Sequence, residues 1–253
     1  MPIKRLIGKI AIVTASTDGI GYAIAHRLAR EGAKVIISSR KAKNVEEATQ
    51  KLTNEGLDVT GLTCHVAKAE DRAKLFQEAS KFGGLDILVS NAAVNPEVGG
   101  VLDCSESSWD KIFEVNVKSS FMLTKEALPL LRKSKAGRII YISSVAGFQP
   151  FDLLGAYSVS KTTLLGLVKA AALQLAPENI TVNSVNPGLV TTRFSSALTQ
   201  NPAAREAALA QIPMGRFAVP DDIAGSVAFL ASDDGLYVTG ENIVVAGGMA
   251  SRL

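Results

Sequence analysis

The sequence is poor in the residues that mark disulfide-bonded and membrane proteins. It holds two cysteines, two histidines and one tryptophan in 253 residues. Cys64 and Cys104 stand in no paired motif, which favours reduced thiols over a disulfide framework. No apolar run reaches the length of about 18 residues that a transmembrane helix requires. We therefore expect no membrane span, and no metal site is predicted.

Charge of one sign is also lacking. The 27 basic and 24 acidic residues are interspersed and give a net charge of +3, so no nucleic-acid-binding patch is expected. A hydrophobic content of 47% and a charged content of 20% are ordinary for a soluble globular protein of one α/β domain. Met1-Pro2-Ile3-Lys4-Arg5 leads almost directly into the first predicted strand, so no cleaved leader is expected.

What the sequence does contain is an alternation of strand and helix patterns. Strands are predicted near 9–14, 34–39, 58–64, 86–90, 137–143, 179–186 and 242–245, and helices near 19–32, 43–56, 69–82, 108–133, 156–176 and 220–231. This alternation predicts an α/β fold, a Rossmann-type doubly wound parallel sheet in a single domain over residues 1–253. In such a sheet, ligands bind at the carboxyl ends of the strands.

The first strand and helix are joined by a glycine-containing turn. Lys9 to Thr14 is a short apolar run, and Ala15-Ser16-Thr17-Asp18-Gly19-Ile20-Gly21 leads from it into a helical pattern. Glycines let a backbone approach a pyrophosphate, and a helix N-terminus offers free N–H groups and a positive dipole end. The turn therefore predicts a dinucleotide site, although a strand-to-helix turn without a ligand remains an alternative.

A second pattern lies in the middle of the chain. Tyr157 and Lys161 are four residues apart on a predicted helix and so share one face, and Ser144 precedes them at the end of a predicted strand. A cation beside a phenol favours the phenolate, so we expect Lys161 to lower the pKa of Tyr157. Tyr157 could then exchange a proton with a substrate oxygen near neutral pH. Taken alone, the Tyr/Lys spacing could also belong to a solvated helix face.

Together these motifs resemble the short-chain dehydrogenase/reductase family over nearly the whole chain. Thr14, Gly19 and Gly21 match the family's glycine motif, but Ala15 stands where the family has a glycine. The resemblance implies that Asn116, Ser144, Tyr157 and Lys161 are catalytic, with Asn116 holding a water that passes protons to Lys161. It implies cofactor contacts at Ser16, Asp18, Gly19, Ile20, Gly21, Ser39, Arg40, Lys41, His65, Val66, Asn91, Ala92, Ala93, Tyr157, Lys161, Pro187, Gly188, Val190 and Thr192.

The end of the second predicted strand bears on the choice of cofactor. NAD-binding folds tend to place an acidic residue there, to bind the ribose 2′-hydroxyl, whereas Ser39 occupies the place here and is followed by Arg40 and Lys41. A hydroxyl beside a guanidinium accepts a 2′-phosphate, so NADP (NADPH) is predicted over NAD. Arg40 and Lys41 could instead be solvated cations. His65 replaces an acid that is frequent in the family, and packing explains it as well as an adenine contact does.

The predicted substrate pocket is mostly apolar. We expect Phe148, Leu153, Leu154 and Phe194, with Ser144 and Tyr157, to contact the substrate, and the irregular region 191–219 to form a substrate loop rather than a plain surface insertion. The resemblance implies a small-molecule carbonyl or alcohol substrate such as retinal, an aromatic ketone, an α-dicarbonyl or a ketosteroid. A 3-oxoacyl-thioester reductase of the same fold and a non-catalytic dinucleotide sensor are the alternatives.

Assembly and cellular address are also predicted. The helix that carries Tyr157 is apolar nearly all round, so we expect it to be buried on more than one side. The resemblance implies that it pairs with the 108–133 helix of another subunit in a homotetramer; burial under loops of the same subunit is the alternative. Ser251-Arg252-Leu253 is a near variant of the peroxisomal Ser-Lys-Leu signal, which predicts a peroxisomal protein, with the cytoplasm as the alternative.

Overall fold

The computed structural model describes residues 4–193, 195 and 202–251. Its centre is a seven-stranded, wholly parallel sheet with the strand order β3-β2-β1-β4-β5-β6-β7. The strands are β1 (Ile10–Val13), β2 (Lys34–Ser39), β3 (Val59–Thr63), β4 (Ile87–Ser90), β5 (Gly137–Ile142), β6 (Ile180–Pro187) and β7 (Asn242–Val245). All seven were predicted, and the Rossmann-type doubly wound fold is confirmed.

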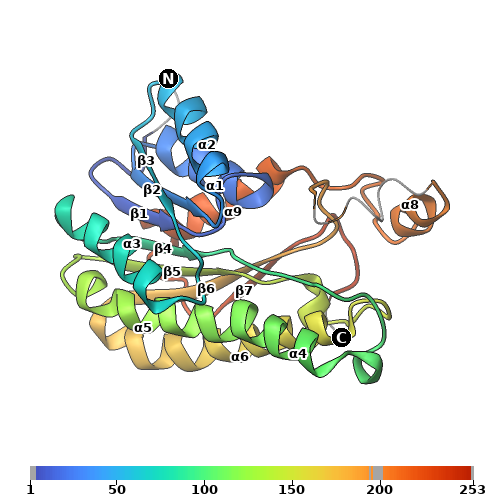
Figure 1. Ribbon diagram of the computed structural model, residues 1–253. Helices are drawn as coiled ribbons and strands as arrows, with labels where there is room; N and C mark the ends of the chain where they lie inside the picture. Colours follow the sequence, from blue (N-terminus) through green and yellow to red (C-terminus); the bar gives the residue numbers. More distant parts are fainter. Residues whose placement is uncertain (1–3, 194, 196–201, 252–253) are drawn as a thin grey trace.

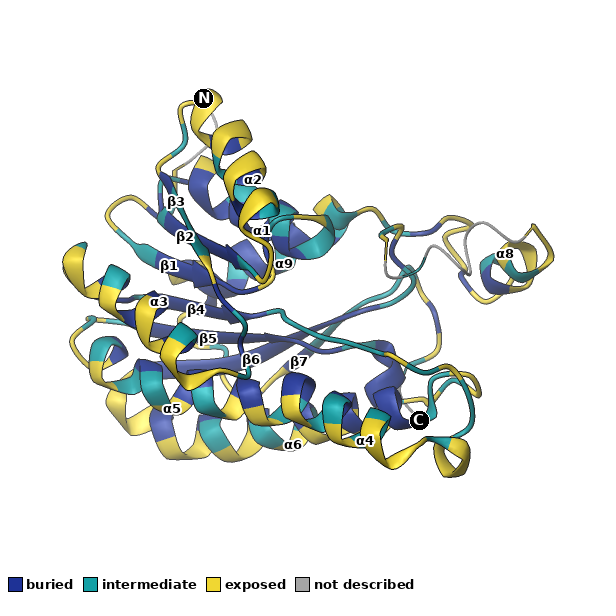
Figure 2. Cartoon of the chain, in the orientation of Figure 1, coloured by how far each residue is buried: buried dark blue, intermediate teal, exposed yellow. Residues whose placement is uncertain are grey.

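Helices cover both faces of the sheet (Figure 1). One layer holds α1 (Gly19–Arg30), α2 (Ala42–Asn54) and α9 (Pro220–Ala231), and the other holds α3 (Ala69–Lys81), α5 (Ser119–Leu131) and α6 (Gly155–Leu175). The short helix α8 (Pro202–Leu209) lies in the predicted loop region and stands away from the two layers in Figure 1. Because helices pack on both faces, the five inner strands are buried along almost their whole length (Figure 2), whereas most residues of the edge strands β3 and β7 are partly exposed.

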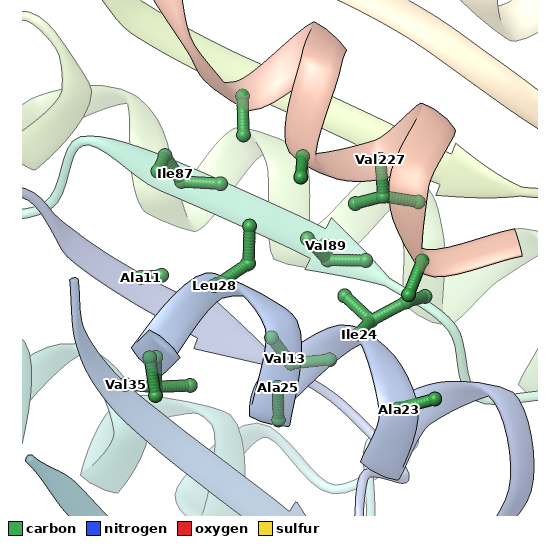
Figure 3. Close-up of a cluster of buried hydrophobic side chains, with 14 of the residues drawn as sticks. Ala11, Val13, Ala23, Ile24, Ala25, Leu28, Val35, Ile87, Val89 and Val227 are labelled. Carbon is green, nitrogen blue, oxygen red and sulfur yellow. The ribbon is translucent and has the colours of Figure 1, made fainter. Parts of the chain in front are cut away.

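The core between α1, α9 and the sheet shows how the apolar runs are used (Figure 3). Ile24 and Leu28 of α1 have no exposed surface and pack with Val13 and Val89 from neighbouring strands and Val227 of α9. Full burial of an aliphatic side chain of this size contributes about 1.5–3 kcal/mol. This packing fixes the N-terminus of α1 beside the carboxyl end of β1.

The predicted helix over 108–133 is not continuous. It consists of α4 (Glu106–Ile112), a π-helical segment η2 (Phe113–Lys118) and α5, and it begins two residues earlier than predicted. A π turn widens the helix by one residue per turn and shifts the faces that follow it, which a 3.6-residue pattern does not reveal. The widened segment contains Asn116, one of the predicted site residues.

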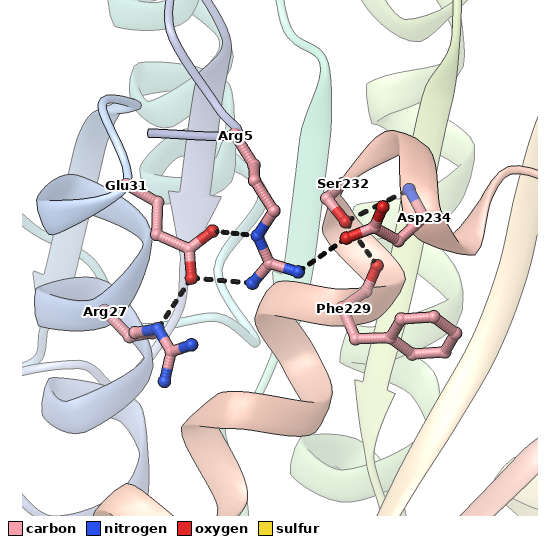
Figure 4. A network of polar contacts seen from close by, with 6 residues as sticks. All are labelled: Arg5, Arg27, Glu31, Phe229, Ser232 and Asp234. Carbon is pink, nitrogen blue, oxygen red and sulfur yellow. Dashed lines mark hydrogen bonds and ion pairs between the residues drawn. The ribbon is translucent and has the colours of Figure 1, made fainter. Parts of the chain in front are cut away.

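A polar network holds the start of the chain against the end of the sheet where the strands begin (Figure 4). Arg5 donates two hydrogen bonds of 2.7 Å to Glu31, which follows α1, and one of 2.7 Å to Asp234, and Arg27 also binds Glu31.

Within the described part of the chain, no helix is long and apolar enough to cross a membrane. The same residues contain no group of three or more His, Cys, Asp or Glu that could hold a metal ion.

Candidate active site

The strand order reverses between β1 and β4. The chain proceeds from β1 outward to β3, then returns to add β4 on the other side of β1. The connections that leave these two strands therefore diverge and leave a crevice at their carboxyl ends, where ligands of doubly wound sheets bind. The predicted glycine turn follows β1 and Asn91 follows β4, so both predicted motifs lie at this crevice.

The glycine turn has the backbone that a close approach to a ligand requires. Gly19 has φ of 56° and Ala15 has φ of 51°, both in the left-handed region. A Cβ on Gly21 would overlap the Ala15 carbonyl oxygen and lie 2.5 Å from the Asn91 side-chain nitrogen. Ala15 thus adopts the conformation that glycine would take without strain, so its substitution leaves the shape of the turn intact.

Asn91 and Thr14 tie the two sides of the crevice together. The Asn91 side chain donates hydrogen bonds of 3.0 Å to the carbonyl oxygens of Thr14 and Ala15. In return, the Thr14 hydroxyl accepts the backbone N–H groups of Asn91 at 3.0 Å and Ala92 at 3.2 Å. Asn91 thereby holds Ala15 in its left-handed conformation, and Ala92 and Ala93 beside it remain half-exposed.

Two polar residues of the turn have different surroundings. Ser16 is buried, and its hydroxyl donates to Val13 at 2.6 Å and accepts from the Ser38 backbone at 3.0 Å, so its side chain serves the fold. Asp18 is exposed at the N-cap of α1 and pairs with Arg193 at 2.7 Å. Ile20, half-exposed, follows in the first turn of that helix.

Positive charge gathers beyond the carboxyl ends of β2 and β3. Ser39 ends β2 and is half-buried, while Arg40 and Lys41 are exposed. The ring of His65 accepts a 3.2 Å hydrogen bond from the Ala67 backbone at Nδ1, so its other nitrogen carries the proton. Burial, followed by the charges of Lys111 and Arg40, lowers the pKa of His65.

Val66, the neighbour of His65 and another predicted cofactor contact, is buried in the core between the sheet and α3.

The predicted catalytic side chains meet at the end of β5. Ser144 follows β5 and begins the short 3₁₀ helix η3 (Val145–Gly147), and Tyr157 lies in the first turn of α6. A hydrogen bond joins their side chains. Lys161 lies one turn further along α6, with its ammonium nitrogen 5.5 Å from the centre of the Tyr157 ring and 2.8 Å from the Ile142 carbonyl oxygen.

Burial controls the protonation of this group. Tyr157 and Lys161 are 8% and 2% exposed, and desolvation disfavours the charged form of each. Burial raises the pKa of Tyr157 above its ordinary value, against a smaller lowering by the Ser144 hydrogen bond, and burial lowers the pKa of Lys161 to about 7. The predicted lowering of the Tyr157 pKa is therefore wrong, because burial of the phenol disfavours its charged form.

Asn116 is wholly buried and fully engaged by the protein. Its oxygen accepts the Val94 N–H at 2.8 Å, and its nitrogen donates at 3.0 Å both to the Val94 carbonyl and to the Ser160 hydroxyl. The side chain thus links the segment after β4 to α6, one residue before Lys161. That it also holds a water for Lys161 stays a prediction.

The segment after β6 closes the crevice from the other side. Pro187 is the last residue of β6, and a Cβ on Gly188 would lie 2.9 Å from the Cα of Ala246. Val190 is buried and forms an isolated parallel β-bridge with Ala218. The Thr192 methyl lies 3.4 Å from the position of a Cβ on Gly19, so this segment reaches the glycine turn.

The segment between Ser144 and Tyr157 carries several apolar side chains. Phe148 and Leu154 are half-buried, and Leu153 is 64% exposed. Val98 and Leu102 are also exposed, and their segment is bonded to the 153–155 segment through Gly99. Phe194, the remaining predicted substrate residue, lies outside the described residues.

Comparison with known proteins agrees with this geometry. A family model described as enoyl-(acyl carrier protein) reductase matches residues 14–250. Dehydrogenase/reductase SDR family member 4 of Bos taurus is 52% identical over 249 residues, which are 98% of this chain and 89% of the relative. The chain belongs to the short-chain dehydrogenase/reductase family. It is an oxidoreductase of that family, as the resemblance predicted.

Solved structures of other short-chain dehydrogenases have the same fold. The Pseudomonas aeruginosa RhlG/NADP active-site complex has a TM-score of 0.90 and 35% identity, and the match covers 98% of each chain. A Beutenbergia cavernae protein, assigned as an NAD(P)-dependent gluconate 5-dehydrogenase and crystallised with NADP, has a TM-score of 0.91 and 32% identity over 97% of this chain and 98% of its own.

Two residues of this short-chain dehydrogenase escaped the sequence analysis. Ser160 binds Asn116, and Arg193 pairs with Asp18 across 175 positions of sequence. Neither partner could be found from spacing, because helix η2 and the segment after β6 approach these residues only in the folded chain. Ser160 lies between Tyr157 and Lys161, which is the one signal that could have drawn attention to it.

Proposed function

We propose that the protein reduces hydrophobic carbonyl compounds to alcohols with NADPH, and that the reaction is reversible. One observation carries the proposal: Ser144, Tyr157 and Lys161 converge at the carboxyl end of β5, beside the crevice that the glycine turn lines. When bound, NADPH supplies the hydride to the carbonyl carbon. The protein must then bind the carbonyl oxygen and deliver a proton to it.

The buried phenol and hydroxyl fit that task. The Ser144 hydroxyl and the Tyr157 O–H both donate to the carbonyl oxygen, where negative charge develops, and Tyr157 transfers its proton. The raised pKa of Tyr157 keeps the proton on the phenol until negative charge develops on the carbonyl oxygen. Lys161, with a pKa of about 7, returns a proton to Tyr157 after the transfer. In the oxidative direction the neutral Lys161 amine first takes the Tyr157 proton, and the phenolate then acts as the base.

The crevice fits the cofactor NADP. The glycine turn and the N-terminus of α1 receive the pyrophosphate, and Ser39, Arg40 and Lys41 receive the 2′-phosphate. The described residues at the end of β2 include no carboxylate that would repel this phosphate. NADP in the two related crystal structures supports the assignment.

The apolar surroundings support a hydrophobic substrate. Phe148, Leu153 and Leu154 lie between Ser144 and Tyr157 in the chain, and the exposed Val98 and Leu102 belong to a segment that is hydrogen-bonded to this one. Retinal, aromatic ketones, α-dicarbonyls and ketosteroids are candidate substrates, and region 191–219 serves as the substrate loop. A 3-oxoacyl thioester is the second candidate, supported by the acyl-carrier description of the matching family model.

Steady-state oxidation of NADPH and NADH tests the proposal. A retinal, an α-dicarbonyl, an aromatic ketone and a 3-oxoacyl thioester are the substrates. Turnover with NADPH on the hydrophobic carbonyls supports the proposal, whereas turnover with NADH alone or on the thioester alone contradicts the cofactor or the substrate assignment. Tight NADPH binding without any turnover would favour the dinucleotide sensor.

The role of Tyr157 has its own test. Tyr157→Phe removes the transferable proton, so kcat should fall by about 10²–10⁴. NADPH binding should survive, because the ring remains. The exposed Tyr237 provides the control, since Tyr237→Phe should leave turnover unchanged. Near-normal turnover in Tyr157→Phe would exclude Tyr157 as the proton donor.

We also propose a homotetramer. Val159 and Leu173 are exposed on the outer face of α6, as is Phe121 of α5, so loops of the same chain do not cover these side chains. A second copy that pairs through α5 and α6 would cover these side chains. Sedimentation of wild-type protein and of Leu173→Glu tests this, and a smaller assembly for the variant is the expected result.

Peroxisomal import through Ser251-Arg252-Leu253 remains a proposal of the sequence, since Arg252 and Leu253 lie outside the described residues. A fluorescent reporter that ends in these residues should enter peroxisomes. A diffuse cytosolic signal would contradict the proposal.

A further inference from the structure

The N-cap residue of α1, Asp18, has a side chain that can cap a helix but does not cap this one. Asp18 has the extended backbone of an N-cap residue, and its carboxylate would ordinarily accept N–H groups of the first helical turn. No side-chain hydrogen bond of this kind is present at α1. The first-turn N–H groups of a helix that begins a dinucleotide crevice therefore remain open to another anion.

Arg193 accounts for the position of the Asp18 carboxylate. Its Nε lies 2.7 Å from Asp18 Oδ2, and it comes from the segment after β6, on the other side of the crevice. The contact between Thr192 and Gly19 holds the same two segments together. The carboxylate is thus drawn away from the helix end and toward the facing segment.

We propose that Arg193 is a positioning residue for the cofactor, which keeps the Asp18 carboxylate off the N-terminus of α1 and so leaves that helix end free for the NADP pyrophosphate. This inference rests on the proposed function, in which the crevice binds NADP. Two anions cannot share the same few N–H groups. Arg193 also neutralises Asp18, which would otherwise repel the pyrophosphate.

The effect should be moderate because both side chains are largely exposed. The side chain of Arg193 is 84% exposed and that of Asp18 is 51% exposed, so solvent screens their charges. Without Arg193, the carboxylate gains the helix N–H groups and competes with the ligand for them. We expect a loss of NADPH affinity of about five- to tenfold, since two unit charges about 3–4 Å apart in bulk water interact by about 1–1.4 kcal/mol.

A double-mutant cycle tests the proposal. The Kd for NADPH is measured by nucleotide fluorescence for the wild type, Arg193→Ala, Asp18→Ala and the double variant. Arg193→Ala should bind about five- to tenfold more weakly than the wild type, whereas the double variant should bind within about twofold of Asp18→Ala. Arg132→Ala, which breaks an exposed ion pair with Glu178, is the control and should bind normally.

A second probe locates the effect. Adenosine 2′-monophosphate lacks the pyrophosphate, so its affinity should be equal in the wild type and Arg193→Ala. A loss that persists in the double variant would mean that Arg193 acts on the cofactor directly, and an unchanged Arg193→Ala would mean a surface ion pair; either result overturns the inference alone. A wild type that does not bind NADPH would overturn the proposed function and this inference with it.

Discussion

Lys161 should make the ligand-free protein less stable as the pH falls. Burial lowers its pKa from an ordinary value of 10.5 to about 7, so the unfolded chain binds its proton more tightly than the folded protein does. The stability of the folded state is then complete only above the unfolded-state pKa of 10.5, and it declines as the pH falls toward 7. From these two pKa values, the loss is about 2 kcal/mol at pH 9 and about 4 kcal/mol at pH 7.

Lys161→Met removes this titration and keeps most of the side-chain volume. It also leaves the Ile142 carbonyl oxygen without the 2.8 Å hydrogen bond from Lys161, which costs about 1–3 kcal/mol at every pH. The variant should therefore be more stable than the wild type at pH 7, and this advantage should shrink by about 2 kcal/mol by pH 9. Its reductase activity should be lost.

Urea unfolding of the ligand-free proteins at pH 7, 8 and 9 measures the effect, with fluorescence of the single tryptophan and far-ultraviolet circular dichroism as signals. Lys169→Met is the control, because Lys169 lies two turns along the same helix with 61% of its side chain exposed. Its free energy of unfolding, plotted against pH, should stay parallel to that of the wild type. A Lys161→Met curve that is also parallel would show that Lys161 stays charged in the folded protein, which would refute the lowered pKa of Lys161 on which the proposed proton path depends.

Three further substitutions test the crevice. Ala15→Gly relieves a left-handed alanine and should raise the free energy of unfolding by about 1 kcal/mol in urea unfolding, with NADPH affinity retained; a destabilised variant would contradict the strain. Gly21→Ala should abolish NADPH binding in a fluorescence titration through overlap with the Ala15 carbonyl, whereas Gly166→Ala, which meets no atom within 4 Å, should bind normally. Ser39→Asp beside Arg40 should lower kcat/KM for NADPH about tenfold or more relative to NADH; an unchanged ratio would refute the 2′-phosphate assignment.

The fold could be predicted because parallel strands buried on both faces leave a plain signal. Each strand is a short apolar run, and each predicted strand boundary lies within one residue of the observed one. The meeting of Ser39, Asn91 and Ser144 at one edge follows from the same pattern, since each residue ends or follows a parallel strand. The π turn at Asn116 left no such signal in the apolar pattern, and the partners of Asn116, Val94 and Ser160, are distant from it in sequence.

The protonation states of Tyr157 and Lys161 could not be predicted from the sequence. The spacing of Tyr157 and Lys161 correctly predicts their proximity, but the direction of the pKa shift depends on how much water reaches them. Here both are buried, so desolvation outweighs the attraction between their charged forms. The pair is then better suited to passing one proton along than to holding a phenolate at rest. A proton donor for a carbonyl oxygen needs that property, and the burial that produces it is the feature of the site that only the folded chain reveals.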